Sequence, residues 1–157
     1  MEQYKHLPLR IGVGIVLLNE QNKIFVGKRI DNPTNFWQMP QGGVNKNENF
    51  FNAAKRELEE ETGIKSIELL KEIDEWLEYN LPENLLGKIW QGKYRGQKQK
   101  WFIMRFLGKN TEINIKTKNP EFLDWKWIDL DLITDVVVDF KRHVYKELKE
   151  KVKKLIN

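Results

Sequence analysis

The chain contains no cysteine and only two histidines, His6 and His143, among 157 residues. The absence of cysteine excludes disulfides, thiolate nucleophiles and cysteine-ligated metals, and it fits a reducing cytoplasm. Two histidines leave little material for a histidine-based metal site or a catalytic triad. Redox chemistry is therefore not expected, and any catalytic site should be built from carboxylates.

Long apolar runs are also missing. No stretch approaches the roughly 18 consecutive apolar residues of a membrane span, and the first ten residues lack the apolar run of a signal peptide. No linker rich in proline, glycine or serine and no repeat interrupts the chain. We therefore expect one cytoplasmic domain over residues 1–157, with its core at about 8–150, and no membrane partner.

One acidic segment stands out against this background. Residues 42–64 read GGVNKNENFFNAAKRELEEETGI. On a helix, Glu57, Glu60 and Glu61 stand at i, i+3 and i+4, with Cβ atoms roughly 5 to 6 Å apart on one face. Phe51, Ala54 and Leu58 form an adjoining apolar stripe that would hold the helix on a core.

The ends of this helix have recognisable signals. Asn47 or Asn49 can cap its start, and Gly63 stands where a left-handed glycine ends a helix. Gly42 and Gly43, which follow Pro40 and Gln41, predict a loop that turns with positive φ and brings the backbone close to a ligand.

Three neighbouring carboxylates repel one another, so they predict either a raised pKa or a bound cation. Ligation by oxygen alone favours Mg²⁺, Mn²⁺ or Ca²⁺ over zinc, and Mg²⁺ bridges readily to substrate phosphates. The alternative is an ordinary solvated acidic helix, which is the usual fate of a run of charge.

The spacing of the segment is specific. Gly42, Glu48, Arg56-Glu57-Leu58, Glu60-Glu61 and Gly63-Ile64 occupy the fixed positions of the Nudix box. The chain thus resembles the Nudix hydrolases, which split a nucleoside diphosphate linked to another group by water attack at phosphorus. Segments at 37–43 (WQMPQGG), 76–82 (WLEYNLP), 96–102 (GQKQKWF), 120–127 (PEFLDWKW) and 137–145 (VVDFKRHVY) are similar to the bacterial RNA pyrophosphohydrolase and dinucleoside polyphosphate hydrolase subfamily.

The resemblance implies a set of metal ligands and catalytic residues. It implies that Glu57, Glu60 and Glu61 hold Mg²⁺ or Mn²⁺, with more than one ion once substrate is bound. Glu121, outside the box, matches a glutamate that reaches the metal site as ligand or base. Arg56 is expected to support the box by pairing with Glu48 or with a catalytic glutamate. The sequence does not single out one glutamate as the general base.

A second set of residues is expected to bind substrate. The cationic candidates for the phosphates are Arg10, Arg29, Lys98 and Lys100, and Tyr79 can donate to phosphate or stack. Phe140, with Val138 and Lys141 beside it, resembles the aromatic residue that stacks on a nucleobase. The alternative is that Phe140 packs beneath the following helix. The loop Gln41-Gly42-Gly43 completes the predicted substrate site.

Hydrophobic periodicity predicts an α+β fold. Residues 10–19 and 23–29 form a predicted hairpin, residues 67–78, 99–107 and 122–128 are strand-like, and residues 135–156 are helical. A long loop is expected at 80–97. This order agrees with the Nudix fold, which the resemblance implies: a mixed β-sheet sandwiched between α-helices.

Three functions compete at this point. The first is removal of pyrophosphate from triphosphorylated RNA 5′ ends, which would initiate RNA decay. The second is asymmetric hydrolysis of diadenosine tetraphosphate and related dinucleotides, and the third is a non-catalytic nucleotide-binding module. The net charge of +4 around an acidic centre suits a polyanionic substrate. DNA is not expected as a partner, and the sequence points to no particular activating protein.

Overall fold

The computed structural model describes residues 4–31 and 35–157. Within them, seven strands form one mixed sheet in the order β4-β6-β1-β2-β7, with β3 paired to β1 and β5 paired to β6. The strands are β1 (Leu9–Leu18), β2 (Ile24–Arg29), β3 (Gln41–Gly43), β4 (Ile67–Glu72), β5 (Leu77–Asn80), β6 (Gly96–Phe106) and β7 (Phe122–Ile128). Strands β1 and β6 run parallel, and the other pairings are antiparallel.

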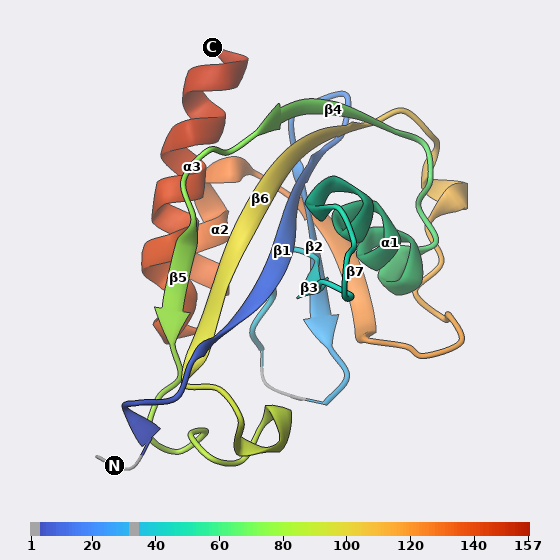
Figure 1. Cartoon of the computed structure of the whole chain (residues 1–157). Coiled ribbons are helices and arrows are strands. Elements are labelled where there is room, and N and C mark those ends of the chain that lie inside the picture. The colour runs from blue at the N-terminus through green and yellow to red at the C-terminus, as the bar shows by residue number, and fades with distance from the viewer. Residues whose placement is uncertain (1–3, 32–34) are drawn as a thin grey trace.

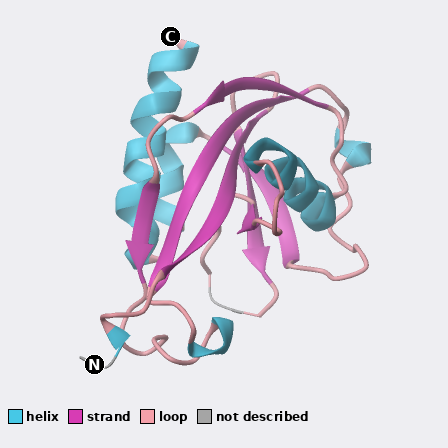
Figure 2. Ribbon diagram, in the orientation of Figure 1, coloured by secondary structure: helices cyan, strands magenta, loops and turns pink. Residues whose placement is uncertain are grey.

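Helices cover both faces of this sheet. Helix α1 (Phe50–Thr62) lies on one face, and α2 (Ile133–Val136) and α3 (Arg142–Ile156) lie on the other (Figures 1 and 2). The predicted α+β sandwich is therefore confirmed. No helix in the described parts of the chain is long and apolar enough to cross a membrane.

The two-sided cover explains the sequence of β1. Its odd-numbered residues Val13, Ile15 and Leu17 join the core under α1, whereas Val16 and Leu18 join the core under α3. All five are fully buried. A strand buried on both faces reads as a continuous apolar run instead of an alternating one, which is the pattern that residues 10–19 show.

Helix α1 begins and ends as its sequence predicts. The side chain of Asn49 accepts a hydrogen bond from the Asn52 amide, so Asn49 and not Asn47 is the cap. Gly63 has a φ of 73°, and its amide donates to the Glu59 carbonyl. The caps set the first residue of the helix and thereby fix which face carries the glutamates.

Three expectations about the strands were wrong. The predicted strand at 67–78 is two strands, because the pairing of β4 with β6 shifts register between Leu69 and Lys71 and the chain then turns before β5. Strand β6 starts at Gly96, three residues before the predicted Gln99. Residues 41–43 form strand β3 against β1, where a loop was expected.

The predicted helix at 135–156 is interrupted. Val137 and Val138 are extended, with ψ of 155° and 147°, and a single 3₁₀ turn (Asp139–Lys141) precedes α3. Val137 is 1% exposed, so burying its side chain takes precedence over continuing the helix. As a result, residues 138–141 lie at the start of α3 as a turn and not on a helical face.

Candidate active site

Arg56 organises the acidic face of α1. Its Nε and Nη2 donate to the two oxygens of Glu48 at 2.8 and 3.0 Å, and Nη2 also donates to the Gly43 carbonyl at 2.9 Å. Nη1 donates to Glu57 Oε1 at 2.8 Å and to Glu60 Oε2 at 3.2 Å. The expected pairing with Glu48 is present, and this pairing lowers the pKa of Glu48 to about 2. Arg56 therefore joins α1 to β3 and fixes the carboxylate of Glu57.

Glu57 lies directly against β3. A Cβ atom at Gly42 would overlap the Glu57 carboxylate, and a Cβ atom at Gly43 would overlap the guanidinium of Arg10. The glycine pair thus lets two side chains of the protein approach the backbone, and the expected positive φ is absent, because both residues have the extended backbone of a strand. The expected approach to a ligand stays a prediction. Glycine is needed here for space and not for conformation.

Glu61 is the most buried of the box glutamates. It is 3% exposed, and its Oε2 has no hydrogen-bond partner among the described residues. Burial raises the pKa of Glu61 well above its usual range, and the charges of Glu57 and Glu121 raise it further, while Arg29 opposes them. A buried carboxyl oxygen without a partner is costly, so this site calls for a cation.

The other two predicted ligands, Glu60 and Glu121, each lie beside an arginine. The Glu60 side chain is exposed and bonds to Arg56. The Glu121 side chain lies 3.9 Å from Arg29 Nη2, and Arg29 itself donates to both oxygens of Asp31 at 2.8 and 2.6 Å. Within residues 4–31 and 35–157, no group of three or more acidic, histidine or cysteine side chains is already arranged around a metal position.

The residues present nevertheless fit a divalent cation. The unpartnered Glu61 oxygen is a free ligand, and Glu57 and Glu121 are close enough for their charges to raise the pKa of Glu61. All of the donors are hard carboxylate oxygens, which suit Mg²⁺ and Mn²⁺.

Hydrogen-bonded polar side chains lie on β1, β5 and β6. Arg10 Nη1 donates to Gln97 Oε1 at 2.7 Å, and Gln97 Nε2 donates to the hydroxyl of Tyr79 at 3.2 Å. Gln99 Nε2 donates to Gln41 Oε1 at 3.1 Å. This chain of hydrogen bonds fixes two predicted phosphate-binding side chains, Arg10 and Tyr79, beside the β3 residue Gln41.

The turn before α3 packs against Tyr79. The Phe140 ring lies 5.5 Å from the Tyr79 ring at 46°, and Phe140 is partly buried against the core beneath α3. Val138 is partly buried beside it. Lys141 is 7% exposed, its Nζ donates to Gln38 Oε1 at 3.3 Å, and burial followed by the charge of Arg29 lowers its pKa to about 7.

Two predicted phosphate ligands lie elsewhere. Lys98 Nζ and Lys100 Nζ are 4.9 and 5.6 Å from the centre of the Trp76 ring. Lys100 Nζ also donates to the Asp74 carbonyl at 2.9 Å. Lys100 Nζ is also 3.6 Å from Glu72 Oε2, and neither lysine forms an ion pair with a box glutamate among the described residues.

The alternation of side chains along β6 identifies two residues that the sequence analysis missed. Gln97 and Gln99, the neighbours of the two lysines, face Tyr79 and Gln41. The signal was available, since successive side chains of a strand point to opposite faces. Gln38, which bonds to Lys141, and Trp90, which contacts Arg10, had no comparable signal in the sequence.

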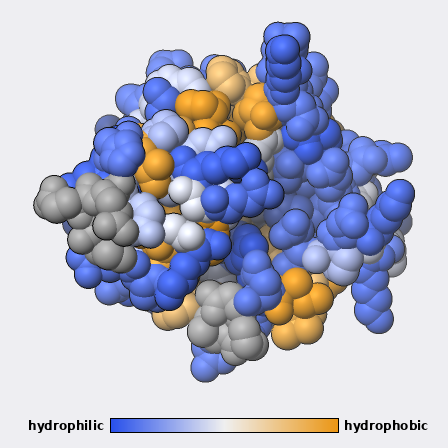
Figure 3. All heavy atoms as spheres, turned by 60° about the horizontal axis from the view of Figure 1, so that its bottom comes forward, coloured by the Kyte–Doolittle hydropathy of each residue, from blue (hydrophilic) through white to orange (hydrophobic). Residues whose placement is uncertain are grey.

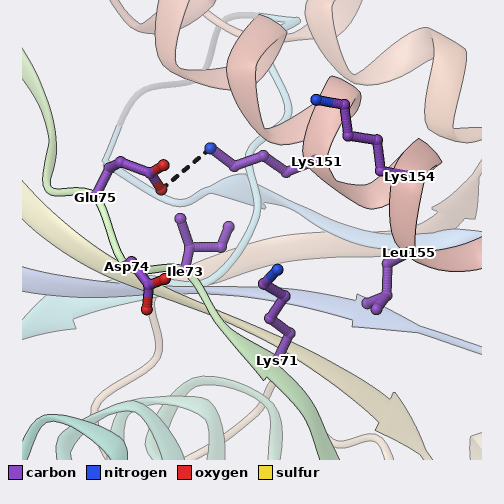
Figure 4. Close-up of a pocket in the computed structure, with 7 residues that line it drawn as sticks. All are labelled: Lys71, Ile73, Asp74, Glu75, Lys151, Lys154 and Leu155. Atoms are coloured by element: carbon purple, nitrogen blue, oxygen red, sulfur yellow. Dashed lines mark ion pairs between the residues drawn. The ribbon is translucent and has the colours of Figure 1, made fainter.

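Figure 3 looks onto the end that carries the residue 81–95 loop, where hydrophilic side chains surround small hydrophobic patches. A separate cavity of about 270 Å³ lies between the β4–β5 connection and the end of α3 (Figure 4). It is lined by Lys71, Ile73, Asp74, Glu75, Lys151, Lys154 and Leu155, and none of the predicted site residues contributes to it.

Comparison with known proteins identifies the family. The NUDIX domain matches residues 8–148, so the chain belongs to the Nudix family, and the predicted fold and hydrolase class are confirmed. It is 70% identical over 152 residues to the RNA pyrophosphohydrolase of Pelagibacter ubique, covering 97% of this chain and 96% of the relative. It is 49% identical over 146 residues to the RNA pyrophosphohydrolase of Roseobacter denitrificans, covering 92% and 91%.

Solved structures agree on the fold at low sequence identity. The E. coli dihydroneopterin triphosphate pyrophosphohydrolase is 20% identical with a TM-score of 0.69, covering 92% of this chain and 99% of that one. An Ap4A hydrolase binary complex from C. elegans is 15% identical with a TM-score of 0.64, covering 90% and 98%. The mixed sheet between helices is thus the common Nudix architecture.

Proposed function

We propose that this chain is a cytoplasmic, metal-dependent hydrolase that removes pyrophosphate from the 5′ triphosphate end of RNA and so initiates RNA decay. The observation that carries the proposal is the 70% identity, over nearly the full length of both chains, to a relative with this activity in its name. We take residues 1–157 as one catalytic domain, with its core at about 8–150 and its box at 42–64.

Nudix enzymes generally use divalent metal ions. For this chain we infer Mg²⁺ or Mn²⁺, which Glu57, Glu60, Glu61 and Glu121 would hold, and more than one ion when substrate is bound. When bound, the metal neutralises phosphate charge and lowers the pKa of a coordinated water. Phosphoanhydride hydrolysis needs no nucleophilic side chain, since positioning and charge stabilisation do most of the work.

The chain's own residues supply the positioning. Arg56 holds the Glu57 carboxylate against Gly42 and links it to Glu48. The box carboxylates share protons as a coupled set, so the proton of the attacking water passes to that set. Water attack at phosphorus breaks one phosphoanhydride bond and leaves a 5′ monophosphate and pyrophosphate.

The polyphosphate and the nucleoside would lie on opposite sides of Tyr79. Arg10, Arg29 and Lys141 supply positive charge, the Tyr79 hydroxyl can donate, and the backbone of Gln41, Gly42 and Gly43 lies beside the carboxylates. Phe140, with Val138 next to it, would stack on a base. We leave Lys98 and Lys100 out of the proposed site, because the contacts they make are with Trp76 and its neighbours.

Turnover of triphosphorylated RNA and of diadenosine tetraphosphate should be measured side by side at several Mg²⁺ concentrations. We expect RNA to have the higher kcat/KM and to yield pyrophosphate. Preferential turnover of the dinucleotide would favour the second candidate function. Absence of metal-dependent phosphate release from either substrate would indicate a binding module.

A further inference from the structure

The loop between β5 and β6 contains a backbone conformation that its sequence does not favour. Trp90 and Gln91 have φ of 51° and 57°, and Gly92 continues the left-handed turn at 70°. This conformation suits glycine and is a clear outlier for a bulky residue such as tryptophan. Such strain persists only where the surroundings enforce it, and it is concentrated at functional sites.

The strained turn places the indole of Trp90 against Arg10. Arg10 Cζ lies 5.3 Å from the centre of the indole, which is within cation–π range. Tyr94 contacts the indole at 6.2 Å and 78°, in an edge-on arrangement. Trp90 is also partly buried against the core beneath α3. The indole is thus held by the protein and in turn limits where the guanidinium can lie.

Two further contacts confine Arg10. Its Nη1 donates to Gln97 Oε1 at 2.7 Å, and the backbone of Gly43 approaches so closely that a Cβ atom there would overlap the guanidinium. The base of the loop is joined to β1 as well, since the Arg95 amide donates to the Pro8 carbonyl at 3.1 Å. The loop and Arg10 therefore form one unit at the end of the sheet (Figure 1).

We propose that Trp90 is a positioning residue for the polyphosphate: its indole holds the Arg10 guanidinium in the orientation that meets the substrate phosphates. This inference rests on the proposed function, in which Arg10 binds phosphate. The planar fork of arginine binds phosphate only in suitable orientations. The left-handed conformation of Trp90 places the indole for this contact and is retained despite its strain.

A double-mutant cycle between Trp90 and Arg10 tests this role. Trp90→Ala should raise KM for triphosphorylated RNA about five- to tenfold through the lost cation–π contact, with kcat changed less than about twofold. Trp90→Phe, which keeps an aromatic face, should recover most of the loss. In an Arg10→Ala background, Trp90→Ala should have no further effect on KM. Effects of the two substitutions that multiply would overturn the proposal.

The adjacent residue provides a matched control. Gln91→Gly relieves the same kind of strain without touching Arg10, so it should leave KM unaltered and Tm equal or higher. A Gln91→Gly variant with the same KM increase as Trp90→Ala would show that loop shape, and not the indole, is responsible. If RNA were not a substrate, the proposed function would fail, and the same cycle measured with diadenosine tetraphosphate would still decide the role of Trp90.

Discussion

Glu61 shows how the environment of one residue divides the roles of chemically identical neighbours. Glu60 is exposed and bonds to Arg56, Glu57 is fixed by Arg56, and Glu61 is buried with an unpartnered oxygen. The raised pKa of Glu61 means that the folded protein holds this proton more tightly than the unfolded chain. The buried carboxylate therefore lowers stability when it is ionised, unless a cation compensates it.

We expect Glu61→Gln to stabilise the metal-free protein and to inactivate the enzyme. Ionisation of Glu61 costs nothing at a pH below its unfolded pKa, and the cost grows as pH rises toward the raised folded pKa. Tm of the variant without metal should exceed that of wild type at about pH 8 and not at about pH 4. With Mg²⁺, turnover should fall about a hundredfold or more.

Glu59→Gln serves as the control for this substitution, because Glu59 is exposed and lies outside the proposed site. It should alter neither property appreciably. A Glu61→Gln variant that retains turnover within a few-fold of wild type would contradict the assignment of Glu61 as a metal ligand.

Phe140 tests the separation of recognition from chemistry. If its ring stacks on a base, Phe140→Ala should weaken nucleotide binding by about 1 to 3 kcal/mol and leave Tm nearly unchanged. If its main role is packing beneath α3, the cavity should cost roughly 3 to 5 kcal/mol of unfolding free energy. Tm and KM for triphosphorylated RNA, measured on one variant, distinguish the two. A large drop in Tm with an unaltered KM would exclude the stacking role.

At the scale of elements, β3 is the part that assembles the site. It pairs with β1 through Gly12↔Gly43 and Gly14↔Gln41 and carries Gly42 against Glu57. Arg56 joins α1 to the same strand through the Gly43 carbonyl. The three residues of β3 thus contact both the acidic side chains of α1 and the guanidinium of Arg10.

The two glycines of β3 should respond differently to an added methyl group. At Gly42 the Cβ would meet only the Glu57 side chain, so Gly42→Ala should fold normally but displace the carboxylate and lower kcat about a hundredfold. At Gly43 the Cβ would meet the Arg10 guanidinium, so Gly43→Ala should mainly raise KM.

Gly96→Ala is the matched comparison for these variants. Its Cβ would overlap the Tyr79 backbone, which cannot rotate away, so this variant should lose stability. Steady-state kinetics and melting curves of the three variants check the assignment. Equal losses of kcat in Gly42→Ala and Gly43→Ala would contradict these separate roles and indicate that both substitutions simply disturb the local structure of β3.

Some elements of this fold could be predicted from the sequence, and others could not. Local signals were enough for the caps of α1, the acidic face and the buried strand β1, because caps and periodicity depend on near neighbours. Strand β3, the break after β4 and the turn at 138–141 depend on register and on burial of Val137, which are properties of the tertiary structure. Strand alternation could have predicted that Gln97 and Gln99 share one face of β6.

At the scale of the whole molecule, charge is unevenly distributed. The chain has 27 Lys and Arg against 23 Asp and Glu, yet α1 concentrates its glutamates where Glu57 and Glu61 face each other's charge. Burial also raises the pKa of Glu57, and the charge of Glu60 raises it further, although Arg56 opposes both effects. In the folded, metal-free protein the carboxylates of α1 therefore repel one another, and a divalent cation would remove this repulsion.

Metal ions and protons should therefore compete for the same glutamates, and this competition should affect both the stability and the activity of the protein. Protons and Mg²⁺ bind the same carboxylate oxygens, so turnover should fall on acidification, and raising Mg²⁺ should move the acidic limb of the pH profile to lower pH. Because the cation binds the folded state, Tm should rise with Mg²⁺ at neutral pH, and this increase should diminish as the glutamates become protonated. Turnover and melting curves measured over a grid of pH and Mg²⁺ concentration check both effects. An acidic limb that does not respond to Mg²⁺, together with a Tm that is independent of the metal, would place the controlling titration outside the box glutamates.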